Sequence, residues 1–272
     1  MNIAIQGVAG SFHDAAAQSF FSRQPHELIY CSTFSGVFAA LDKNQAKYGV
    51  AAVENSLYGS IHETYDRIAE HHFPIVGEVV LNIHQQLVAN LGTNLSDITE
   101  VVSHPAALDQ CRNFLETHLP HAELIEYHDT AAAADHVHRT GGTHLAAIAS
   151  STAAALYSLE IVAHNIEDHA DNATRFVIIT KEPSRTADAN KATLVLVTSH
   201  QPGALYRALG VFNTYGSNLT KIESRPLRGE RFNYQFLVDV IANENQLVSA
   251  INDLGTQSCR VSLLGHYRSS EL

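Results

Sequence analysis

The sequence predicts a two-domain α/β protein on the basis of three observations. In residues 1–180, short apolar strands alternate with amphipathic helices, which is typical of α/β folds with a largely parallel sheet. Residues 193–268 follow instead the order β-α-β-β-α-β of a ferredoxin-like unit. The polar stretch between them contains Pro183 and lacks helical or strand periodicity, as linkers do. We therefore expect a first domain over residues 1–181, a linker over 182–192 and a second domain over 193–272.

Five strand–helix units make up the predicted first domain. Each begins with a short apolar strand, passes through a turn rich in Gly, Ser or Asn, and continues as an amphipathic helix. The five strands are Asn2–Gln6, Tyr48–Val53, Glu100–Val102, Leu124–Tyr127 and Leu145–Ala149. Because strand-to-helix turns of a parallel sheet meet at its carboxyl edge, ligands bind there. Two readings of these turns remain open. Their Ser and Thr residues either merely cap the helices, as the capping-box spacing of Ser11 with Asp14 and of Ser60 with Glu63 indicates, or five helix N-termini with free N–H groups form a site for a small anion.

The predicted second domain has two helices and four strands. The elements are strand Thr193–Thr198, a helix from Pro202 to about Gly216, strands Asn218–Pro226 and Asn233–Ile241, helix Glu244–Leu254 and strand Arg260–Tyr267. A module of this size has exposed sheet edges, which usually pair with a second copy. We expect a homodimer or a dimer of dimers.

Composition excludes several classes of partner. The 17 Lys and Arg against 28 Asp and Glu give a net charge of −11, which argues against nucleic acid and anionic membranes. No apolar run reaches the ~20 residues needed to span a bilayer, and the first residues do not resemble a signal peptide. The three cysteines lie far apart without a CxxC pair, so we expect a cytoplasmic protein.

The common cofactor motifs are absent. The loop GVAGSF at 7–12 is not the GxGxxG dinucleotide fingerprint, and the chain contains neither a Walker loop nor a GxSxG nucleophile elbow. Fifteen of the 17 histidines lie in residues 1–180, but none belongs to an HExxH motif or a His/Cys cluster. We therefore expect no cofactor and no metal.

Three polar segments border predicted apolar strands: residues 54–56, 103–105 and 172–176. Each is either an ordinary loop or part of a ligand-facing set at the sheet edge. Arg175 is one of only seven cations in residues 1–180 and is flanked by Thr and Asn. A lone arginine beside a strand is often paired with a carboxylate of the protein, but this setting also suits bidentate binding of a ligand carboxylate.

At these segments the chain resembles the prephenate dehydratase family. The motifs that carry the resemblance, in chain order, are GVAGSFH at 7–13, VENSLYGS at 53–60, SHPAALDQC at 103–111, DTAAAA at 129–134, AAIAS at 146–150, NIEDHADNATRF at 165–176, PGAL at 202–205 and ESRP at 223–226. The resemblance implies a catalytic domain of two lobes, like a periplasmic binding protein, with the second lobe roughly over residues 80–155. It also implies that residues 193–272 form an ACT regulatory domain.

The family resemblance implies a lyase that converts prephenate to phenylpyruvate, CO2 and water in L-phenylalanine biosynthesis, inhibited by L-phenylalanine. Loss of CO2 and hydroxide aromatises the ring, so the protein must bind a dianion, desolvate the departing carboxylate and donate to the leaving hydroxyl. Two alternatives remain open. The substrate could be arogenate, or the chain could be a sensor that binds a small anion without catalysis.

The resemblance also implies roles for particular residues. The catalytic set is Thr174, Asn55, Ser103, Gln110 and Glu54, with Thr174 as hydrogen-bond donor to the leaving hydroxyl. Whether Glu54 is an acid or an orienting group stays open. The substrate-binding set is Arg175, which we assign to a substrate carboxylate, together with Ser11, Thr130 and Ser56. The phenylalanine-binding set is Gly203, Ala204, Leu205, Asn218, Leu219, Glu223, Ser224, Arg225 and Pro226.

The chain departs from the usual family pattern at three positions. Val8 and Ala52 stand where the family commonly has proline, and Tyr206 stands where valine usually follows the PGAL turn. The first two changes affect the rigidity of loops, and the third leaves the strength of phenylalanine inhibition open.

Overall fold

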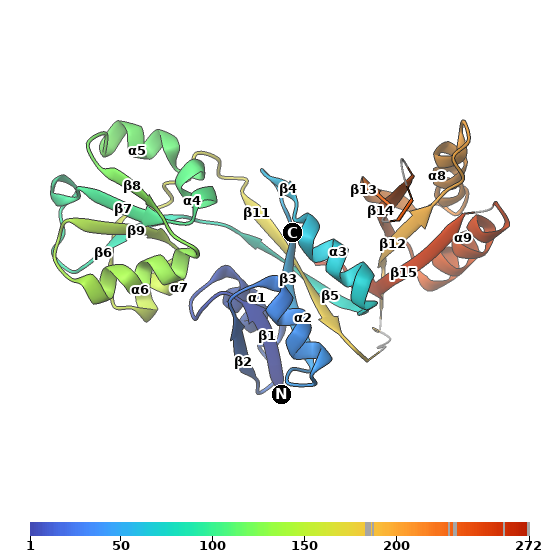
Figure 1. Cartoon of the computed structure of the whole chain (residues 1–272), viewed down its shortest axis with the longest axis horizontal. Coiled ribbons are helices and arrows are strands. Elements are labelled where there is room, and N and C mark those ends of the chain that lie inside the picture. Colours follow the sequence, from blue (N-terminus) through green and yellow to red (C-terminus); the bar gives the residue numbers. More distant parts are fainter. Residues whose placement is uncertain (183–185, 187, 228, 231–232, 258, 271–272) are drawn as a thin grey trace. The chain divides into compact units, whose positions relative to one another are not determined.

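The computed structural model describes the chain except residues 183–185, 187, 228, 231–232, 258 and 271–272 (Figure 1). The described chain forms two units. The first contains Met1–Tyr65 and Val79–Phe176, and the second contains Asp66–Glu78 and Val177–Leu272. The predicted α/β fold class is confirmed. The predicted linker, residues 182–192, includes four of the positions that lie outside the described residues.

The first lobe of the first unit is built on parallel strands. Its elements are β1 (Asn2–Gln6), α1 (Phe12–Phe20), β2 (Glu27–Cys31), α2 (Phe34–Asp42), β3 (Tyr48–Asn55) and β4 (Gly59–Ser60). Strand β1 lies between β2 and β3 and pairs in parallel with both, while β4 folds back antiparallel on β3. Its residues Ile3, Ala4 and Ile5 are fully buried, as expected for a central parallel strand covered on both faces.

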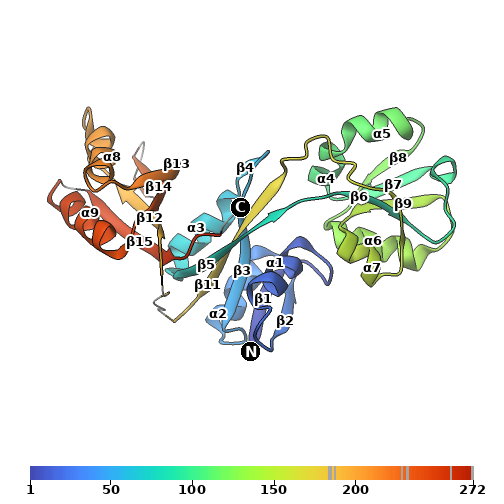
Figure 2. The ribbon, with the colours of Figure 1, turned by 180° about the vertical axis from the view of Figure 1, so that it is seen from behind.

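The second lobe has its own five-stranded sheet, in the order β10-β6-β9-β7-β8. Its elements are β6 (Gln86–Ala89), a short 3-10 helix (Leu95–Asp97), β7 (Glu100–Ser103), α4 (Pro105–Gln110), α5 (Arg112–His118), β8 (Glu123–Glu126), α6 (Thr130–Thr140), β9 (Leu145–Ala149), α7 (Ser151–Leu156) and β10 (Glu160–Ala163). Figure 2 shows α4 and α5 on one face of this sheet and α6 and α7 on the other. A separate apolar core fills each interface. On the α6 side the buried run Ala131–Ala134 lets the helix approach the sheet closely.

The second unit contains the predicted β-α-β-β-α-β order, which is confirmed. Its elements are β12 (Lys191–Val197), α8 (Ala204–Thr214), β13 (Asn218–Pro226), β14 (Tyr234–Ile241), α9 (Glu244–Thr256) and β15 (Arg260–Tyr267). The strands pair antiparallel in the order β13-β14-β12-β15. Phe212, Leu194 and Leu254 are fully buried between this sheet and its helices.

Three elements contribute residues to both units: α3 (His62–His71), β5 (Ile75–Asn82) and β11 (Ala173–Thr180). Within the second unit, β15 continues its sheet by pairing in parallel with β5 at Gly265 and Ile75. A Cβ atom at Gly265 would lie 2.2 Å from the Ile75 carbonyl oxygen, so this pairing requires glycine. In the described residues, no helix combines the length and apolar character needed to cross a lipid bilayer.

Candidate active site

A cavity of about 410 Å³ opens between the two lobes of the first unit. The first lobe and β11 contribute Gln6, Ser11, Phe12, His13, Ala52, Asn55, Tyr58, Ile61, Thr174 and Phe176, and the rest of the lining is Ile83, Gln85, His104, Ala106, Ala107, Gln110, His128, Asp129 and Thr130. The lining thus combines apolar surface with convergent polar groups, as ligand sites do. None of these lining residues is Lys or Arg, and all of them lie in the described part of the chain.

Thr174 and Asn55 are brought together at this cavity from strands far apart in the sequence. The Asn55 carboxamide oxygen accepts the backbone N–H groups of Leu57 (3.0 Å) and Tyr58 (3.1 Å), which fixes the orientation of the amide. Its nitrogen donates to the Thr174 hydroxyl oxygen at 3.0 Å and also lies 2.8 Å from the Asn172 side-chain oxygen. Because Thr174 accepts from Asn55, its own hydroxyl hydrogen remains available to a group in the cavity.

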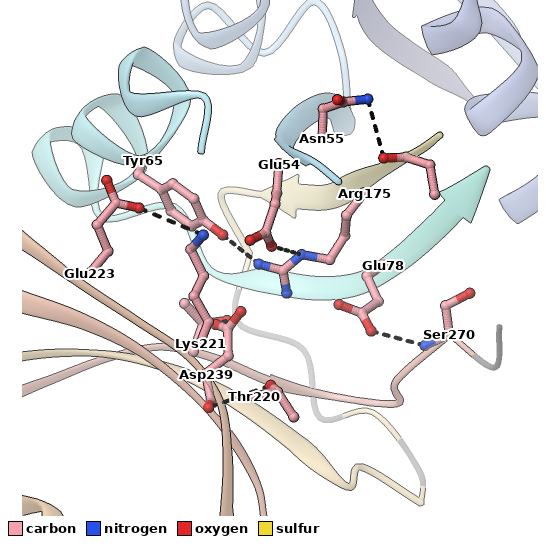
Figure 3. A network of polar contacts seen from close by, with 12 residues as sticks. Glu54, Asn55, Tyr65, Glu78, Arg175, Thr220, Lys221, Glu223, Asp239 and Ser270 are labelled. Carbon is pink, nitrogen blue, oxygen red and sulfur yellow. Dashed lines mark hydrogen bonds and ion pairs between the residues drawn. The ribbon is translucent and has the colours of Figure 1, made fainter. Parts of the chain in front are cut away.

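Arg175 and Glu54 lie outside the cavity lining. Successive side chains of a strand point to opposite faces, so Arg175 turns away from Thr174, and Glu54 turns away from Asn55. Figure 3 shows Glu54 and Tyr65 beside the Arg175 guanidinium. The Arg175 Nε lies 3.3 Å from a Glu54 oxygen, its Nη2 donates to the Tyr65 hydroxyl, and the residue is 7% exposed. This geometry does not support the assignment of Arg175 to a substrate carboxylate.

Two of the predicted serines also lie outside the lining. Ser103 ends β7, is fully buried, and donates its hydroxyl to the Ile148 carbonyl oxygen at 2.7 Å. Ser56 donates to the Asp171 carbonyl oxygen (2.8 Å) and accepts the Ala173 N–H (2.9 Å). Ser56 thereby fastens the end of β3 to the segment that enters β11, so its hydroxyl serves the backbone that positions Thr174.

Gln110 does line the cavity, together with Gln85, which the sequence motifs did not single out. The Gln85 amide nitrogen donates to the Gln110 side-chain oxygen at 3.1 Å. Gln85 is only 2% exposed, and its own side-chain oxygen has no hydrogen-bond partner among the described residues. That oxygen is sealed off from the cavity, so what the pair presents there is the Gln110 side chain, held in place by Gln85.

Four of the predicted helix N-termini carry side-chain caps. Helices α1, α4, α6 and α7 are capped by the side chains of Ser11, His104, Asp129 and Ser150, respectively. At α6 the Asp129 carboxylate accepts the N–H groups of the second and third helical residues at 2.8 and 3.0 Å. These caps take one N–H group at α1, α4 and α7 and two at α6, so the capping alternative holds at these four helices and an anion site there would depend on the remaining N–H groups. Ser11, which caps α1, and Thr130, the first residue of α6, line the cavity.

The glycine-rich loop GVAG brings the lobes into contact. Gly7 has φ +105°, and a Cβ atom there would lie 3.0 Å from an Asp129 carboxylate oxygen. The carbonyl oxygens of Ala9 and Gly10 accept the Tyr157 and Ser150 hydroxyls, both at 3.0 Å. The loop therefore closes one side of the cavity against the second lobe.

A tyrosine makes a second contact between the lobes. The Tyr58 hydroxyl, in the turn between β3 and β4, donates to an Asp109 carboxylate oxygen of α4 at 2.7 Å. Arg112 donates to the other Asp109 oxygen at 2.7 Å. Burial and the Asp109 carboxylate raise the pKa of Tyr58 to about 12, while hydrogen bonds from Arg112 and Tyr58 lower the pKa of Asp109. Tyr58 thus remains a donor over the physiological pH range.

His13 is a further lining residue that motif reasoning missed, although it ends the motif GVAGSFH. Its ring packs edge-on against Phe34 and Phe176, with centroid distances of 5.6 and 5.0 Å. The Ala52 N–H donates to His13 Nε2 at 3.2 Å. Burial lowers the pKa of His13 to about 4, so the imidazole is neutral at physiological pH. His13 lies in the first turn of a Ser-capped helix, and nothing in the sequence indicates that its ring faces a cavity.

The second unit contains a pocket of about 490 Å³. It is lined by the segment 198–206 and Phe236, and therefore by the predicted Gly203, Ala204 and Leu205. The predicted residues Asn218, Leu219, Glu223, Ser224, Arg225 and Pro226 all lie on β13 and do not line it. Ser224 is nevertheless the register partner of Phe236 on β14. Arg225 instead pairs with Asp66 at 2.9 Å.

Comparison with a family model gives a match to prephenate dehydratase over residues 3–184. A bifunctional chorismate mutase/prephenate dehydratase of Aquifex aeolicus strain VF5 is 36% identical, and the match covers 98% of this chain and 73% of the relative's length. A protein of Arabidopsis thaliana named arogenate dehydratase/prephenate dehydratase 2, chloroplastic, is 38% identical, and the match covers 98% of this chain and 72% of the relative's length.

Two solved structures are similar over nearly the whole chain. A prephenate dehydratase of Arthrobacter aurescens in complex with L-Phe has a TM-score of 0.85 and 30% identity, covering 98% of this chain and 90% of that one. A structure named GqqA, a novel type of quorum quenching acylase, has a TM-score of 0.86 and 34% identity, covering 99% of this chain and 98% of that one.

Proposed function

Because the chain belongs to the prephenate dehydratase family, we propose that it converts prephenate to phenylpyruvate, CO2 and water. The observation that carries this proposal is the pair Asn55 and Thr174 at the cavity between the lobes. A hydroxyl that accepts from a fixed amide can direct its hydrogen to the leaving hydroxyl of the substrate. Such a donor stabilises the charge that develops on that oxygen as the C–O bond breaks.

The cavity is suited to a reaction driven by aromatisation. The departing carboxylate of the substrate becomes neutral CO2. A cavity lining without Lys or Arg leaves this carboxylate poorly solvated before the reaction and so favours decarboxylation. The two electrons of the broken C–C bond enter the ring, and the hydroxide leaves from the opposite ring carbon with a proton to form water. Gln110, held by Gln85, contributes polar contacts to the substrate.

Arg175 and Glu54 act on the site indirectly in this proposal. Their ion pair and the contact with Tyr65 hold β11 in place, one residue from Thr174. Ser56 acts similarly through its two backbone contacts. Ser103 supports the second lobe through Ile148. Ser11 and Thr130 remain substrate-binding candidates because they line the cavity.

We place the catalytic domain at residues 1–181, the linker at 182–192 and an ACT regulatory domain at 193–272. The similar Arthrobacter aurescens enzyme was solved with L-Phe, so L-phenylalanine is the proposed inhibitor of this chain. The pocket at Gly203–Leu205 supports a binding site there, and the edge strand β13 suits pairing with a second copy. The proposed assembly is a homodimer or a dimer of dimers, and the proposed compartment is the cytoplasm.

Two competing activities follow from the names of similar proteins. Arogenate differs from prephenate only in its side chain, and the Arabidopsis relative is named for both substrates. Acyl-bond cleavage is suggested by the name of one similar structure. Hydrolysis of an acyl bond requires a base that takes the proton of its nucleophile. Thr174 contacts an amide donor instead, so its geometry favours dehydration.

A substrate comparison tests the proposal. The purified chain is incubated separately with prephenate, arogenate and an acylated amine, and phenylpyruvate, phenylalanine and free amine are quantified. We expect the highest kcat/KM with prephenate. A higher kcat/KM with arogenate would reassign the substrate, and release of amine without phenylpyruvate would refute the dehydratase activity.

A further inference from the structure

The His13 ring has a defined tautomer. A backbone N–H, that of Ala52, points at its Nε2, so this nitrogen must be the acceptor. A neutral imidazole carries its single proton on the other nitrogen, here Nδ1. The low pKa of His13, caused by burial, agrees with a neutral ring, because protonation would remove the acceptor for Ala52.

The Nδ1–H group has no protein partner. Among the described residues the only hydrogen bond of His13 is that of its Nε2, and Nδ1 is not among the buried atoms that lack a partner. His13 lines the cavity. An N–H that is neither bonded nor sealed off, in a residue that lines a cavity, is free to donate to a ligand bound there.

We infer that His13 donates a hydrogen bond from Nδ1 to the keto-acid side chain of the substrate, an inference that rests on the proposed function. Thr174 and Phe176 are two residues apart on the same face of β11, about 7 Å along the strand. The His13 ring contacts Phe176, so His13 and Thr174 reach the cavity at different positions along the strand. In prephenate the hydroxyl and the side chain lie at opposite ends of the ring. With the hydroxyl at Thr174, the other end of the substrate reaches His13.

Two groups of prephenate lie at the end opposite the hydroxyl, the ring carboxylate and the keto-acid side chain, and the reaction chemistry favours the side chain as the acceptor for His13. A hydrogen bond to the departing ring carboxylate would stabilise the ground state more than the transition state, because the carboxylate loses its charge as CO2. The side chain of prephenate keeps its carboxylate and keto oxygen throughout the reaction. A donor there binds substrate and transition state equally well, so His13 sets KM rather than kcat.

A pair of substitutions separates the two nitrogens of His13. Glutamine at position 13 places an amide near the former Nε2 and keeps an acceptor for Ala52, whereas asparagine places an amide near the former Nδ1 and keeps the cavity donor. We expect H13Q to raise KM for prephenate about 10-fold or more, the effect of losing a hydrogen bond to a charged acceptor, with little change in kcat. H13N should stay near the wild-type KM. An unchanged KM in a folded H13Q protein would overturn the inference, as would equal KM increases in both variants.

A binding measurement tests the same claim without turnover. Phenylpyruvate carries the keto-acid side chain of prephenate and does not react further. In protein with 15N-labelled histidine, we expect the His13 Nδ1 proton resonance to shift and to exchange more slowly when phenylpyruvate is added. No change of this resonance at saturating phenylpyruvate would overturn the inference. Wild-type protein that fails to dehydrate prephenate refutes the proposed function alone, because this titration is read independently.

Discussion

At the scale of single residues, the direction of the hydrogen bond between Asn55 and Thr174 determines what the threonine can do. The Asn55 oxygen is occupied by two backbone N–H groups, so its nitrogen must face Thr174. Replacement of Asn55 by Asp keeps the shape but replaces the donor by an acceptor. We expect N55D to lower kcat for prephenate by about 10²-fold, because the Thr174 hydrogen would then point at the carboxylate. Steady-state kinetics measure this, and N55D with wild-type kcat would contradict the assigned hydrogen-bond direction.

His13 also affects stability at the residue scale. Its pKa is about 4 in the folded protein and about 6.5 in the unfolded chain, so the unfolded state binds more protons between these values. The contribution of the neutral ring is therefore complete above pH 6.5 and is lost as the pH falls through 4. We expect the free energy of unfolding to fall between pH 7 and 4.5 by on the order of 2 kcal/mol more in wild type than in H13Q. Urea titrations at both pH values measure this, and equal losses would contradict the low pKa.

At the scale of elements, the turn between β3 and β4 contacts α4 of the other lobe through Tyr58 and Asp109. This bond favours the arrangement in which the cavity is enclosed. Y58F removes it without altering the ring, so the enclosed arrangement becomes less populated and KM for prephenate should rise about 3- to 10-fold. Tyr215 is the matched control, since its hydroxyl donates to an Asp253 carboxylate oxygen at 2.8 Å and it does not line the cavity. Equal KM values for Y58F and Y215F would show that the Tyr58 contact does not affect substrate binding.

Element patterns in the sequence predicted much of the fold. Strands β1, β9, β13 and β15 have the predicted ends. Strands β2, β5, β6 and β10 and helix α2 were not predicted, and β6 and β10 have only four residues each without alternation. The site residues Asn55, Gln110 and Thr174 follow from motifs. The position of Arg175 outside the cavity lining does not follow from the motifs, because a shift of one residue along a strand moves a side chain to the opposite face of the sheet.

At the scale of the whole molecule, the second unit is the proposed sensor of L-phenylalanine. Its pocket begins at Gly203, whose φ is +77°, and a Cβ atom there would lie 3.0 Å from Arg207. We expect G203A to raise the L-phenylalanine concentration that gives half-maximal inhibition by at least about 10-fold, while kcat without the inhibitor stays unchanged. An inhibitor acts only through its unequal affinity for two states of the protein, so weaker binding in this pocket weakens the inhibition. Gly210 in α8 has open space around it, so G210A is the control. Normal inhibition of G203A would place the inhibitor site elsewhere.

The charge of the first 180 residues, 7 cations against 20 anions, acquires a structural meaning at this scale. The lining of the cavity proposed for a dianion contains no Lys or Arg and includes the Asp129 carboxylate, and Arg175, one residue from Thr174, is paired with Glu54. Binding must therefore depend on a few oriented hydrogen bonds rather than on a basic surface. Histidine tautomers and amide orientations leave no trace in composition, which is why the sequence could indicate an anionic ligand but not the groups that bind it.

The most direct test of the account compares the full chain with its T174V and T174S variants on prephenate. We expect phenylpyruvate and CO2 in equal amounts from wild type. We expect kcat to be at least about 10²-fold lower in T174V because the donor is lost, and most of the activity to be retained in T174S because the hydroxyl remains. Formation of phenylpyruvate by T174V at the wild-type rate, or no phenylpyruvate from the wild-type protein, would contradict the account.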